Sequence, residues 1–319
     1  MNQGIPTCRD IERDLVAVAA GEAGVAEARG VERHVAVCRP CRDELGRYRM
    51  LEGMVTDLRR APVAGADPAL SRAELEARLA DIRSRMVSYG IFPSPLGKIL
   101  IARSELGVSM VRYIDSETAA KSHLAHLGGD LVVEDRAAVE STYRELLDYL
   151  NARGTRLSWP LDLRWARSDF QRRVLEATAQ LPYGAVTSYS GIARRIGAPA
   201  SVRAVAQALR HNPIPIAIPC HRVIGSGGDL TGYAGSKIGL KERLLSLEGV
   251  PVGHRAHKIE RGHMYILAEG EVEYCVPSCG DISRKPLAEV TLFGSRQHAE
   301  AVGLSPCSSC RPDLHPLSA

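Results

Sequence analysis

The chain has 319 residues, of which 45% are hydrophobic and 24% are charged, a composition typical of a globular protein with two or three units. No apolar run reaches the ~18 residues that a membrane-spanning helix needs. The first ten residues lack the basic and apolar stretches of a signal peptide. We therefore expect a cytoplasmic protein with no membrane partner. The net charge of +4 is too small to indicate a nucleic-acid partner by itself.

Metal-binding side chains gather near the N-terminus. They are Cys8, His34, Cys38 and Cys41. Three sulfurs and one imidazole match a closed tetrahedral zinc site, and helices are predicted around it over residues 9–18 and 31–50. In the alternative, Cys8 is a buried thiol and His34 a surface side chain. The spacing resembles the small zinc-binding fold of anti-sigma factors, which implies four zinc ligands and a sigma factor or another regulator as partner.

The next segments predict a linker, a helix and a hairpin. Residues 61–69 are rich in Ala, Pro and Gly and indicate a linker. Ser71-Arg72-Ala73-Glu74 is a capping box that opens a charged helix to about residue 86. Two apolar, β-rich stretches, 98–103 and 108–114, are joined by a turn and predict a hairpin. Residues 137–151 then have helical spacing.

Three helices are predicted over residues 168–180, 188–196 and 201–209. The last two are joined by Gly197-Ala198-Pro199-Ala200, a short turn typical of a helix-turn-helix. Nine arginines and only two acids lie between Arg164 and Arg222, which indicates a local basic surface. The alternatives are two ordinary packed helices and a solvated charged face.

A single cysteine, Cys220, lies between a proline-spaced apolar run and His221. The prolines at 213, 215 and 219 cannot donate ladder hydrogen bonds, so the run cannot be a central strand and is predicted to be extended and stiff. The thiolate is the nucleophilic form of cysteine, and a neighbouring imidazole can accept its proton. This arrangement predicts a nucleophile held in a fixed place.

Two pairs of close cysteines lie near the C-terminus: Cys275, Cys279, Cys307 and Cys310. Paired cysteines at both ends of a short segment predict a four-cysteine zinc site. The segment from Phe293 to Asp313 is similar to the metal-binding domain of the Ada repair and regulatory protein. That resemblance implies that Cys275 matches the zinc cysteine that takes methyl groups from phosphotriesters. The sequence around the first pair is less basic than in Ada, which argues against this second activity.

The middle of the chain, about residues 88–250, resembles the O6-alkylguanine-DNA alkyltransferases. The matching blocks come in family order: Phe170-Gln171, Leu181-Pro182-Tyr183-Gly184, Thr187-Ser188-Tyr189, Val202-Arg203-Ala204-Val205, Pro219-Cys220-His221-Arg222-Val223 and Leu230-Thr231-Gly232-Tyr233. The resemblance implies an α+β multidomain protein. A small ribonuclease-H-like α/β subdomain would precede a helical helix-turn-helix alkyltransferase domain, with a small zinc domain at each end.

The expected boundaries follow from these assignments. They are 1–60 for the anti-sigma-like zinc finger, 61–86 for the linker and helix, 87–165 for the α/β subdomain, 166–251 for the DNA-binding and active-site domain, and 252–319 for the Ada-like zinc domain. Up to two structural zinc ions are expected, with no cofactor for alkyl transfer. Because domains of ~50 residues bury little apolar surface, metal removal is expected to unfold both ends and leave the middle folded.

The alkyltransferase resemblance also implies roles for individual residues. The implied catalytic residues are Cys220, His221, Glu248, Tyr189 and Asn212. The implied DNA-binding residues are Arg203, Ala204, Gln207 and Arg210. The implied substrate pocket comprises Val223, Tyr233 and Ala234. Within these sets, Cys220 attacks the alkyl carbon, His221 relays the proton through a water, and Glu248 orients the histidine. Tyr189 protonates the departing base, Asn212 fixes the turn, and Arg203 either fills the gap left by the flipped base or contacts a phosphate.

The implied activity is DNA repair in one turnover, with double-stranded DNA as partner. A methylated-DNA–protein-cysteine S-methyltransferase moves an alkyl group from O6-alkylguanine, and from O4-alkylthymine, to Cys220. The product is a stable thioether, and no group in the motif could hydrolyse it. The alternative function is a zinc-dependent regulator or sensor of DNA damage.

Overall fold

The computed structural model describes residues 7–9, 11–60, 68–127, 131–233, 237–253 and 257–317. The chain forms two compact units, one ending at Glu76 and the other beginning at Ala77. None of the helices within these ranges is long and apolar enough to cross a bilayer. Residues 61–67 of the expected linker and the expected pocket residue Ala234 fall outside the described residues.

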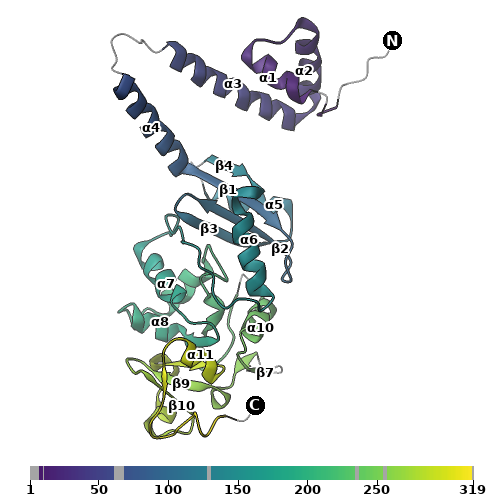
Figure 1. The fold of residues 1–319 in the computed structure, drawn as a ribbon. Coiled ribbons are helices and arrows are strands. Elements are labelled where there is room, and N and C mark those ends of the chain that lie inside the picture. Colours follow the sequence, from purple (N-terminus) through teal and green to yellow (C-terminus); the bar gives the residue numbers. More distant parts are fainter. Residues whose placement is uncertain are drawn as a thin grey trace. The chain divides into compact units, whose positions relative to one another are not determined.

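The first unit is helical (Figure 1). Its elements are α1 (Glu12–Ala20), α2 (Val25–Val37), α3 (Arg39–Arg60) and the first part of α4 (Pro68–Arg85). The first three helices share a small hydrophobic core. Its buried residues are Ile11, Leu15, Val31, Cys41 and Leu45. Gly21 ends α1 with a φ of 74°, a conformation that glycine adopts without steric cost. Because so small a core buries little apolar surface, a bound metal ion would add substantially to the stability of this unit.

Two helix predictions in this unit need correction. The single helix expected over residues 31–50 is broken at Cys38, which is extended with φ −109° and ψ 103°. Pro40 explains the break, because in a continuous helix residue 40 would donate its N–H to the carbonyl of Ala36, and proline has no N–H; in the first turn of α3 this absence costs nothing. The next helix, α4, begins at Pro68 instead of at the capping box of Ser71. Proline is favoured in the first turn of a helix, where its missing N–H costs nothing.

The second unit opens with a four-stranded sheet of order β3-β2-β1-β4. Its elements are β1 (Met86–Phe92), β2 (Lys98–Ser104), β3 (Gly107–Ile114), α5 (Glu117–Ala125), β4 (Leu131–Glu134) and α6 (Arg136–Leu150). The predicted hairpin is confirmed, with β2 and β3 antiparallel from the Lys98–Ile114 pair to the Ser104–Gly107 pair. Helix α6 packs against β1 and β2 (Figure 1). Its buried side chains include Val139, Leu146 and Tyr149.

The helical part follows as α7 (Asp169–Ala179), α8 (Tyr189–Arg195) and α9 (Val202–Arg210), close to the predicted bounds. Serine side chains begin two of these helices. Ser168 accepts a hydrogen bond from the N–H of Gln171 (3.2 Å), and Ser188 from that of Gly191 (3.0 Å). Helix α9 contacts α7 and α8 and buries Val205. The predicted helix-turn-helix is therefore present as α8 and α9.

The proline-spaced run before Cys220 is not extended as predicted. It folds back on itself, with the N–H of Ile218 donating to the carbonyl of Ile214 (2.9 Å) and Ile216 at a φ of +76°. The prolines exclude pairing in a β-ladder, as expected. Other backbone N–H and C=O groups of the segment form hydrogen bonds within the turn instead. The turn leads into η1 (Cys220–Arg222), β6 (Val223–Ile224) and then α10 (Ile238–Leu247).

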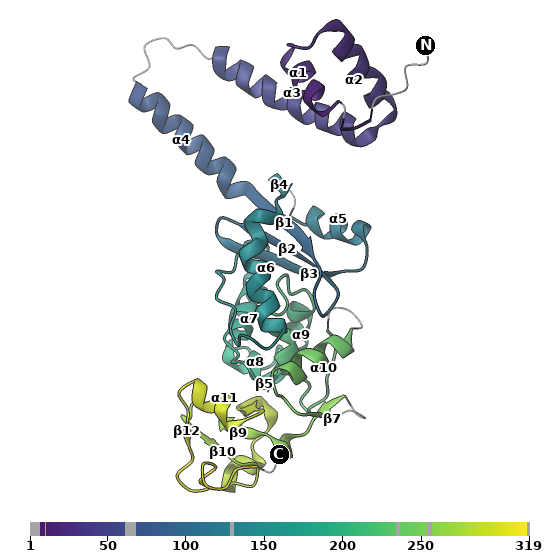
Figure 2. The same cartoon turned by 45° about the vertical axis from the view of Figure 1, so that its right-hand side comes forward.

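The C-terminal region adds short elements to this body. They are β7 (Val252–Gly253), β8 (Lys258–Ile259), η2 (Arg261–His263), β9 (Tyr265–Ala268), β10 (Glu273–Cys275), η3 (Gly280–Arg284), η4 (Leu287–Glu289), β11 (Val290–Phe293), α11 (Arg296–Ala301) and β12 (Ser305–Pro306). Figure 2 shows most of them gathered at the C-terminal end of this unit.

One six-stranded sheet joins this region to the body, in the order β12-β10-β9-β11-β5-β6. Strand β11 pairs antiparallel with β5 (Ala185–Ser188), which places Leu292 opposite Val186. Strand β5 pairs in turn with β6, directly after the Cys220 segment. Val186, Ile224 and Leu245 of the body share a buried cluster with Ile266 and Leu292. The sheet and its core thus cross the expected boundary between residues 251 and 252.

Candidate active site and metal centres

Cys220 is held at the start of η1 by Asn212. The side-chain amide of Asn212 donates to Sγ of Cys220 (3.3 Å) and to the carbonyl of Ile218 (2.8 Å). Its oxygen accepts from the N–H of Ile214 (2.9 Å). Asn212 therefore joins both ends of the turn and fixes the direction of the thiol. Cys220 is 9% exposed, so only a group that enters a cavity beside it can reach Sγ.

His221 and Glu248 form a fully buried pair next to the cysteine. Nε2 of His221 and Oε1 of Glu248 lie 2.5 Å apart, and both side chains are 0% exposed. Because the carboxylate accepts the Nε2 proton, Nδ1 is left as the basic nitrogen of the ring. This Nδ1 is buried and has no hydrogen-bond partner among the described residues. It is available to take a proton.

The same carboxylate is held by three further groups. Arg222 donates to Oε2 of Glu248 (2.7 Å) and to its Oε1 (3.0 Å). The hydroxyl of Tyr149 donates to Oε1, and the N–H of Gly184 donates to Oε2 (3.2 Å). Arg222 also donates to the carbonyl of Leu181 (2.6 Å). The contacts come from three separate segments, which are α6, the loop before β5 and η1, so the position of Glu248 is fixed.

The electrostatics of the site suit proton transfer from Cys220 to His221. Burial raises the pKa of the Cys220 thiol, although Asn212, Lys241 and Arg112 oppose the shift. The thiol is therefore protonated at neutral pH and needs a base. Burial lowers the pKa of His221, so the ring is neutral and can act as that base. Burial favours neutral Glu248, but His221 and Arg222 outweigh it and lower the pKa, which keeps the carboxylate charged.

A cavity of about 740 Å³ opens beside Cys220. Its lining includes residues of α8, α9 and the loop before α10, among them Tyr189, Arg203, Gln207, Arg210, Thr231 and Tyr233. The hydroxyl of Tyr189 donates to the carbonyl of Thr231 (3.3 Å). The cavity is large enough for a nucleobase and lies between the nucleophile and the helix-turn-helix. A second cavity of about 510 Å³ also reaches Cys220 and has Arg112, Arg167 and Lys237 in its wall.

Helix α9 presents a polar face outward. Arg203, Ala204, Gln207 and Arg210 are all exposed, while Val205, Ala208 and Leu209 are buried. The exposed positions follow the i, i+1, i+4, i+7 pattern of one helix face. No carboxylate pairs with Arg203 or Arg210 in the described part of the chain. Two unneutralised guanidinium groups beside a small alanine form a surface that phosphates can approach.

The structure also places residues that sequence reasoning placed differently or missed. Val223, expected in the substrate pocket, is fully buried in β6 and lines neither cavity at Cys220. Tyr149 and Lys241 were missed. Lys241 is fully buried and donates to the carbonyls of Val223 (2.5 Å) and Thr231 (3.1 Å). Their positions in the helical pattern could have indicated such a role. Both lie on the buried faces of amphipathic helices, where the polar end of the side chain needs a hydrogen-bond partner.

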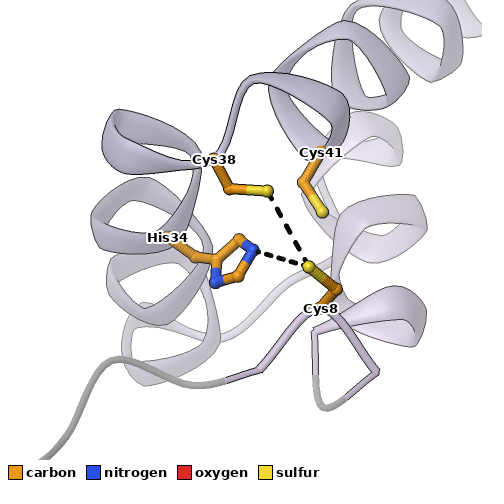
Figure 3. Close-up of side chains that lie close together, drawn as sticks. All are labelled: Cys8, His34, Cys38 and Cys41. Atoms are coloured by element: carbon orange, nitrogen blue, oxygen red, sulfur yellow. Dashed lines mark hydrogen bonds between the residues drawn. The ribbon is translucent and has the colours of Figure 1, made fainter.

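The N-terminal cluster has the geometry of a zinc site (Figure 3). Sγ of Cys8 lies 3.5 Å from Nε2 of His34 and 3.8 Å from Sγ of Cys38. A tetrahedral ion with bonds of ~2.3 Å separates its ligands by about 3.8 Å. All four ligand atoms, including Sγ of Cys41, lie within 4.8 Å of one another. The backbone N–H of Cys41 lowers the pKa of Cys38 to about 7, which favours the thiolate that binds metal.

The C-terminal cluster fits zinc equally well. The sulfurs of Cys275, Cys279, Cys307 and Cys310 all lie within 4.8 Å of one another. Cys275 ends β10, and Cys307 follows β12, whose parallel pairing with β10 brings the two pairs together. Burial raises the pKa of Cys307, but the N–H groups of Cys310 and Ser309 outweigh it and lower the pKa to about 7. The chain thus has two zinc-binding sites, and each is preorganised by its own backbone.

A buried cysteine with a histidine–carboxylate pair, beside an exposed helix-turn-helix, defines a cysteine-dependent transferase that handles nucleic acid. Family models agree in each part of the chain. Residues 87–163 match the 6-O-methylguanine DNA methyltransferase ribonuclease-like domain, and residues 169–250 match the DNA-binding domain of the same proteins. Residues 8–42 match a putative zinc-finger, and residues 260–313 match the metal binding domain of Ada.

Individual relatives match the middle of the chain. A methylated-DNA–protein-cysteine methyltransferase of Methanosarcina acetivorans is 39% identical over 161 residues, which cover 50% of this chain and 97% of the relative. The constitutive enzyme of that name from Bacillus subtilis is 36% identical over 168 residues, 51% of this chain and 95% of the relative. The crystal structure of Mycobacterium tuberculosis O6-methylguanine methyltransferase is 38% identical, with a TM-score of 0.44, and covers 51% of this chain and 93% of that one.

The chain belongs to the family of the methylated-DNA–protein-cysteine methyltransferases. The relatives named above are covered almost completely by about half of this chain. The two zinc-binding parts therefore lie mostly outside the portion shared with them.

Proposed function

We propose that this protein repairs DNA by moving an alkyl group from O6 of guanine, and from O4 of thymine, to Sγ of Cys220. The observation that carries the proposal is that Cys220 lines a base-sized cavity and directly precedes His221, which forms a buried pair with Glu248. The proposed substrate is double-stranded DNA with alkylated bases, and the proposed location is the cytoplasm. The protein acts once, because the thioether product is stable to attack by water.

The transfer is an in-line displacement. Nδ1 of His221 takes the thiol proton, directly or through a water, as Sγ attacks the alkyl carbon. The carbon–O6 bond breaks and its electron pair moves into the guanine ring. The hydroxyl of Tyr189, which lines the cavity, donates a proton so that guanine leaves neutral. Glu248 stabilises the imidazolium that forms. Burial raises the pKa of Tyr189, so this hydroxyl keeps its proton at neutral pH.

The alkylated base must leave the helical stack to reach Sγ. Extrusion costs a few kcal/mol of unstacking, least for a weakly paired base. The exposed face of α9 borders the cavity, and Arg203 and Gln207 belong to both. We place the DNA on this face, with Arg203 in the gap left by the base and Arg210 on the backbone. Ala204 has only a methyl group there, which allows the helix to approach a narrow groove.

Mass spectrometry of a stoichiometric reaction tests the proposal. The full chain is mixed with an equimolar duplex carrying O6-methylguanine, and intact and peptide masses are taken. We expect one methyl group per protein, on the peptide that contains Cys220, and none with an undamaged duplex. A Cys220→Ser variant should bind the duplex without gaining mass. Methylation elsewhere, or in that variant, would refute the assignment of Cys220 as the nucleophile.

A separate duplex with a methyl phosphotriester tests Cys275 as a second acceptor.

A second proposal concerns the N-terminal unit. Helix α3 carries exposed apolar side chains along one face: Met50, Leu51, Met54, Val55 and Leu58. Such a stripe is unusual for a solvated helix and fits a helical protein partner. We propose that this unit binds a regulator, with a sigma factor as the class implied by the anti-sigma resemblance, so that alkylation is coupled to a signal.

Binding of the full chain to purified sigma factors, measured by calorimetry, tests this second proposal. Met54 is 55% exposed, and Met54→Glu should abolish binding while Cys220 remains reactive. Val16→Glu is the matched control, because Val16 is 49% exposed on α1 and lies outside the stripe. Equal binding by both variants, or none by the wild type, would rule out this surface.

A further inference from the structure

Glu248 depends on a loop that touches it from two sides. The hydroxyl of Tyr183 donates to the carbonyl of Leu247 (3.0 Å), and the N–H of Gly184 donates to Oε2 of Glu248 (3.2 Å). The Tyr183 ring also meets the Tyr149 ring edge to face, with centroids 5.8 Å apart. Tyr149 itself donates to Oε1 of Glu248. If this loop shifts, the carboxylate that orients His221 shifts with it.

The C-terminal region holds this loop in place. The N–H of Gly294 donates to the carbonyl of Gly184 (2.9 Å), just after β11. The imidazole of His298, on α11, meets the Tyr183 ring edge to face, with centroids 5.3 Å apart at 79°. The same imidazole lies over the Cα of Gly184, where any Cβ would overlap Nδ1. The loop is therefore clamped by a backbone bond on one side and a ring on the other.

Glycines make this close approach feasible. A Cβ on Gly249 would lie 3.3 Å from Cε1 of His298, and one on Gly294 would overlap the carbonyl of Gly249. Gly184 and Gly249 have φ of 69°, where side chains are strained in any case. The backbone next to Glu248 thus carries no side chain where His298 and Gly294 pack closely against it.

Folding stability alone does not account for the imidazole at this position. Nδ1 of His298 is buried and has no hydrogen-bond partner among the described residues, an arrangement that costs stability. Burial lowers the pKa of His298, and the charge of Glu248 opposes the shift. The ring is therefore neutral and lies within electrostatic reach of the carboxylate.

We propose that His298 is a positioning residue for alkyl transfer, acting through the Tyr183–Gly184 loop on Glu248. The inference rests on the proposed function and extends the active site into the C-terminal zinc-binding region. His298 touches neither substrate nor Cys220. Its ring keeps the loop packed, which keeps Glu248 against Nε2 of His221 and leaves Nδ1 as the basic nitrogen of the ring.

Single-turnover kinetics of the full chain test the proposal. The rate of methyl transfer is measured at saturating O6-methylguanine duplex, and the dissociation constant is measured separately on an undamaged duplex. His298→Ala should slow transfer about ten-fold, because small displacements of catalytic groups are costly, while DNA affinity changes less than about two-fold. His298→Phe keeps a ring on Tyr183 and should restore most of the rate.

A matched variant separates positioning from general loss of stability. The buried Tyr274, in the same region, donates from its hydroxyl to Glu300 (2.7 Å), and Tyr274→Phe removes that bond without touching the loop. This variant should lower the melting temperature and leave the transfer rate unchanged. Equal slowing by Tyr274→Phe and His298→Ala, or no slowing by His298→Ala, would overturn the proposal. Absence of transfer in the wild type would instead refute the proposed function.

Discussion

At the scale of single residues, the site converges on the carboxylate of Glu248. It accepts hydrogen bonds from His221, Arg222, Tyr149 and Gly184, and its side chain has no exposed surface. A buried charge of this kind is tolerated only because every partner is in place. Glu248, which we propose to orient His221, is therefore also a residue on which we expect the stability of the body to depend.

Glu248→Gln should lower the free energy of unfolding by ~3–5 kcal/mol, because it leaves the buried Arg222 without its counter-ion. Transfer to Cys220 should slow as well. Urea unfolding followed by tryptophan fluorescence measures the change, since Trp159 and Trp165, the two tryptophans of the chain, both lie in the second unit. Arg144→Ala, which breaks an exposed pair with Glu140 on α6, is the control and should cost far less.

Glu248→Gln should also change how the stability of the protein depends on pH in the acid range. Burial raises the pKa of Glu248, but His221 and Arg222 lower it by more, so the folded value lies below the unfolded one. A depressed carboxyl pKa contributes stability above the unfolded value of ~4.3, and this contribution is lost as the pH falls. Wild-type stability should therefore drop below about pH 4.3 more steeply than that of Glu248→Gln. Parallel curves would contradict the assignment.

Sequence motifs predict a nucleophile and a base in Cys220 and His221 but contain no signal for the residues that support them. Cys220, His221 and Asn212 are close in the chain, so one motif contains them. Tyr149 and Lys241 reach the site only through the packing of α6 and α10. His298 lies still further along the chain, in a region expected to be separate. Contacts between distant segments leave no local pattern to read.

At the scale of elements, helices were predictable where caps are readable, and short strands were not. Ser168 and Ser188 begin the helices predicted over residues 168–180 and 188–196, and both accept an N-cap hydrogen bond in α7 and α8. Strands β5, β6 and β11 have four residues or fewer and gain their stability from distant partners. Pro40 was the readable signal for the break between α2 and α3 and was overlooked.

Helix α9 provides a test that separates the two roles of Arg203. If its guanidinium fills the gap left by an extruded base, Arg203→Ala should slow transfer from duplex about ten-fold and spare transfer from a single strand, where no gap forms. Rates on both substrates under single-turnover conditions measure this ratio. Arg144→Ala serves again as a charge-matched control. Equal slowing on both substrates would indicate a phosphate contact instead.

At the scale of the whole molecule, the two zinc-binding parts differ in how they connect to the body. The N-terminal cluster has its own core in the first unit, around Val31 and Leu45. The C-terminal cluster shares a sheet with β5 and β6, and a core with Val186 and Ile224. We therefore expect metal removal to unfold the first part without affecting the middle, and to weaken the middle together with the second part.

Loss of zinc from the C-terminal site should weaken the body as well. Cys307→Ser should lower the melting temperature reported by Trp159 and Trp165 and slow transfer to Cys220, because β11 loosens against β5. Cys38→Ser is the control, since its cluster lies in the other unit. Zinc content, measured by a colorimetric chelator, should fall by one ion per protein in each variant. An unchanged melting temperature for Cys307→Ser would show that the sheet is rigid without metal.

The position of β11 in the sheet has a consequence for the timing of synthesis. The ribosome releases β5 and Cys220 well before β11, so a nascent chain carries its nucleophile while one edge of β5 is still open. Until β11 fills that edge, nothing covers Val186 from the side of Leu292. Because each protein molecule would accept only one alkyl group, alkylation of Cys220 before folding is finished would inactivate that molecule. Because β11 follows Cys220 in the sequence, we expect full reactivity only after this later strand has been synthesised and has paired with β5.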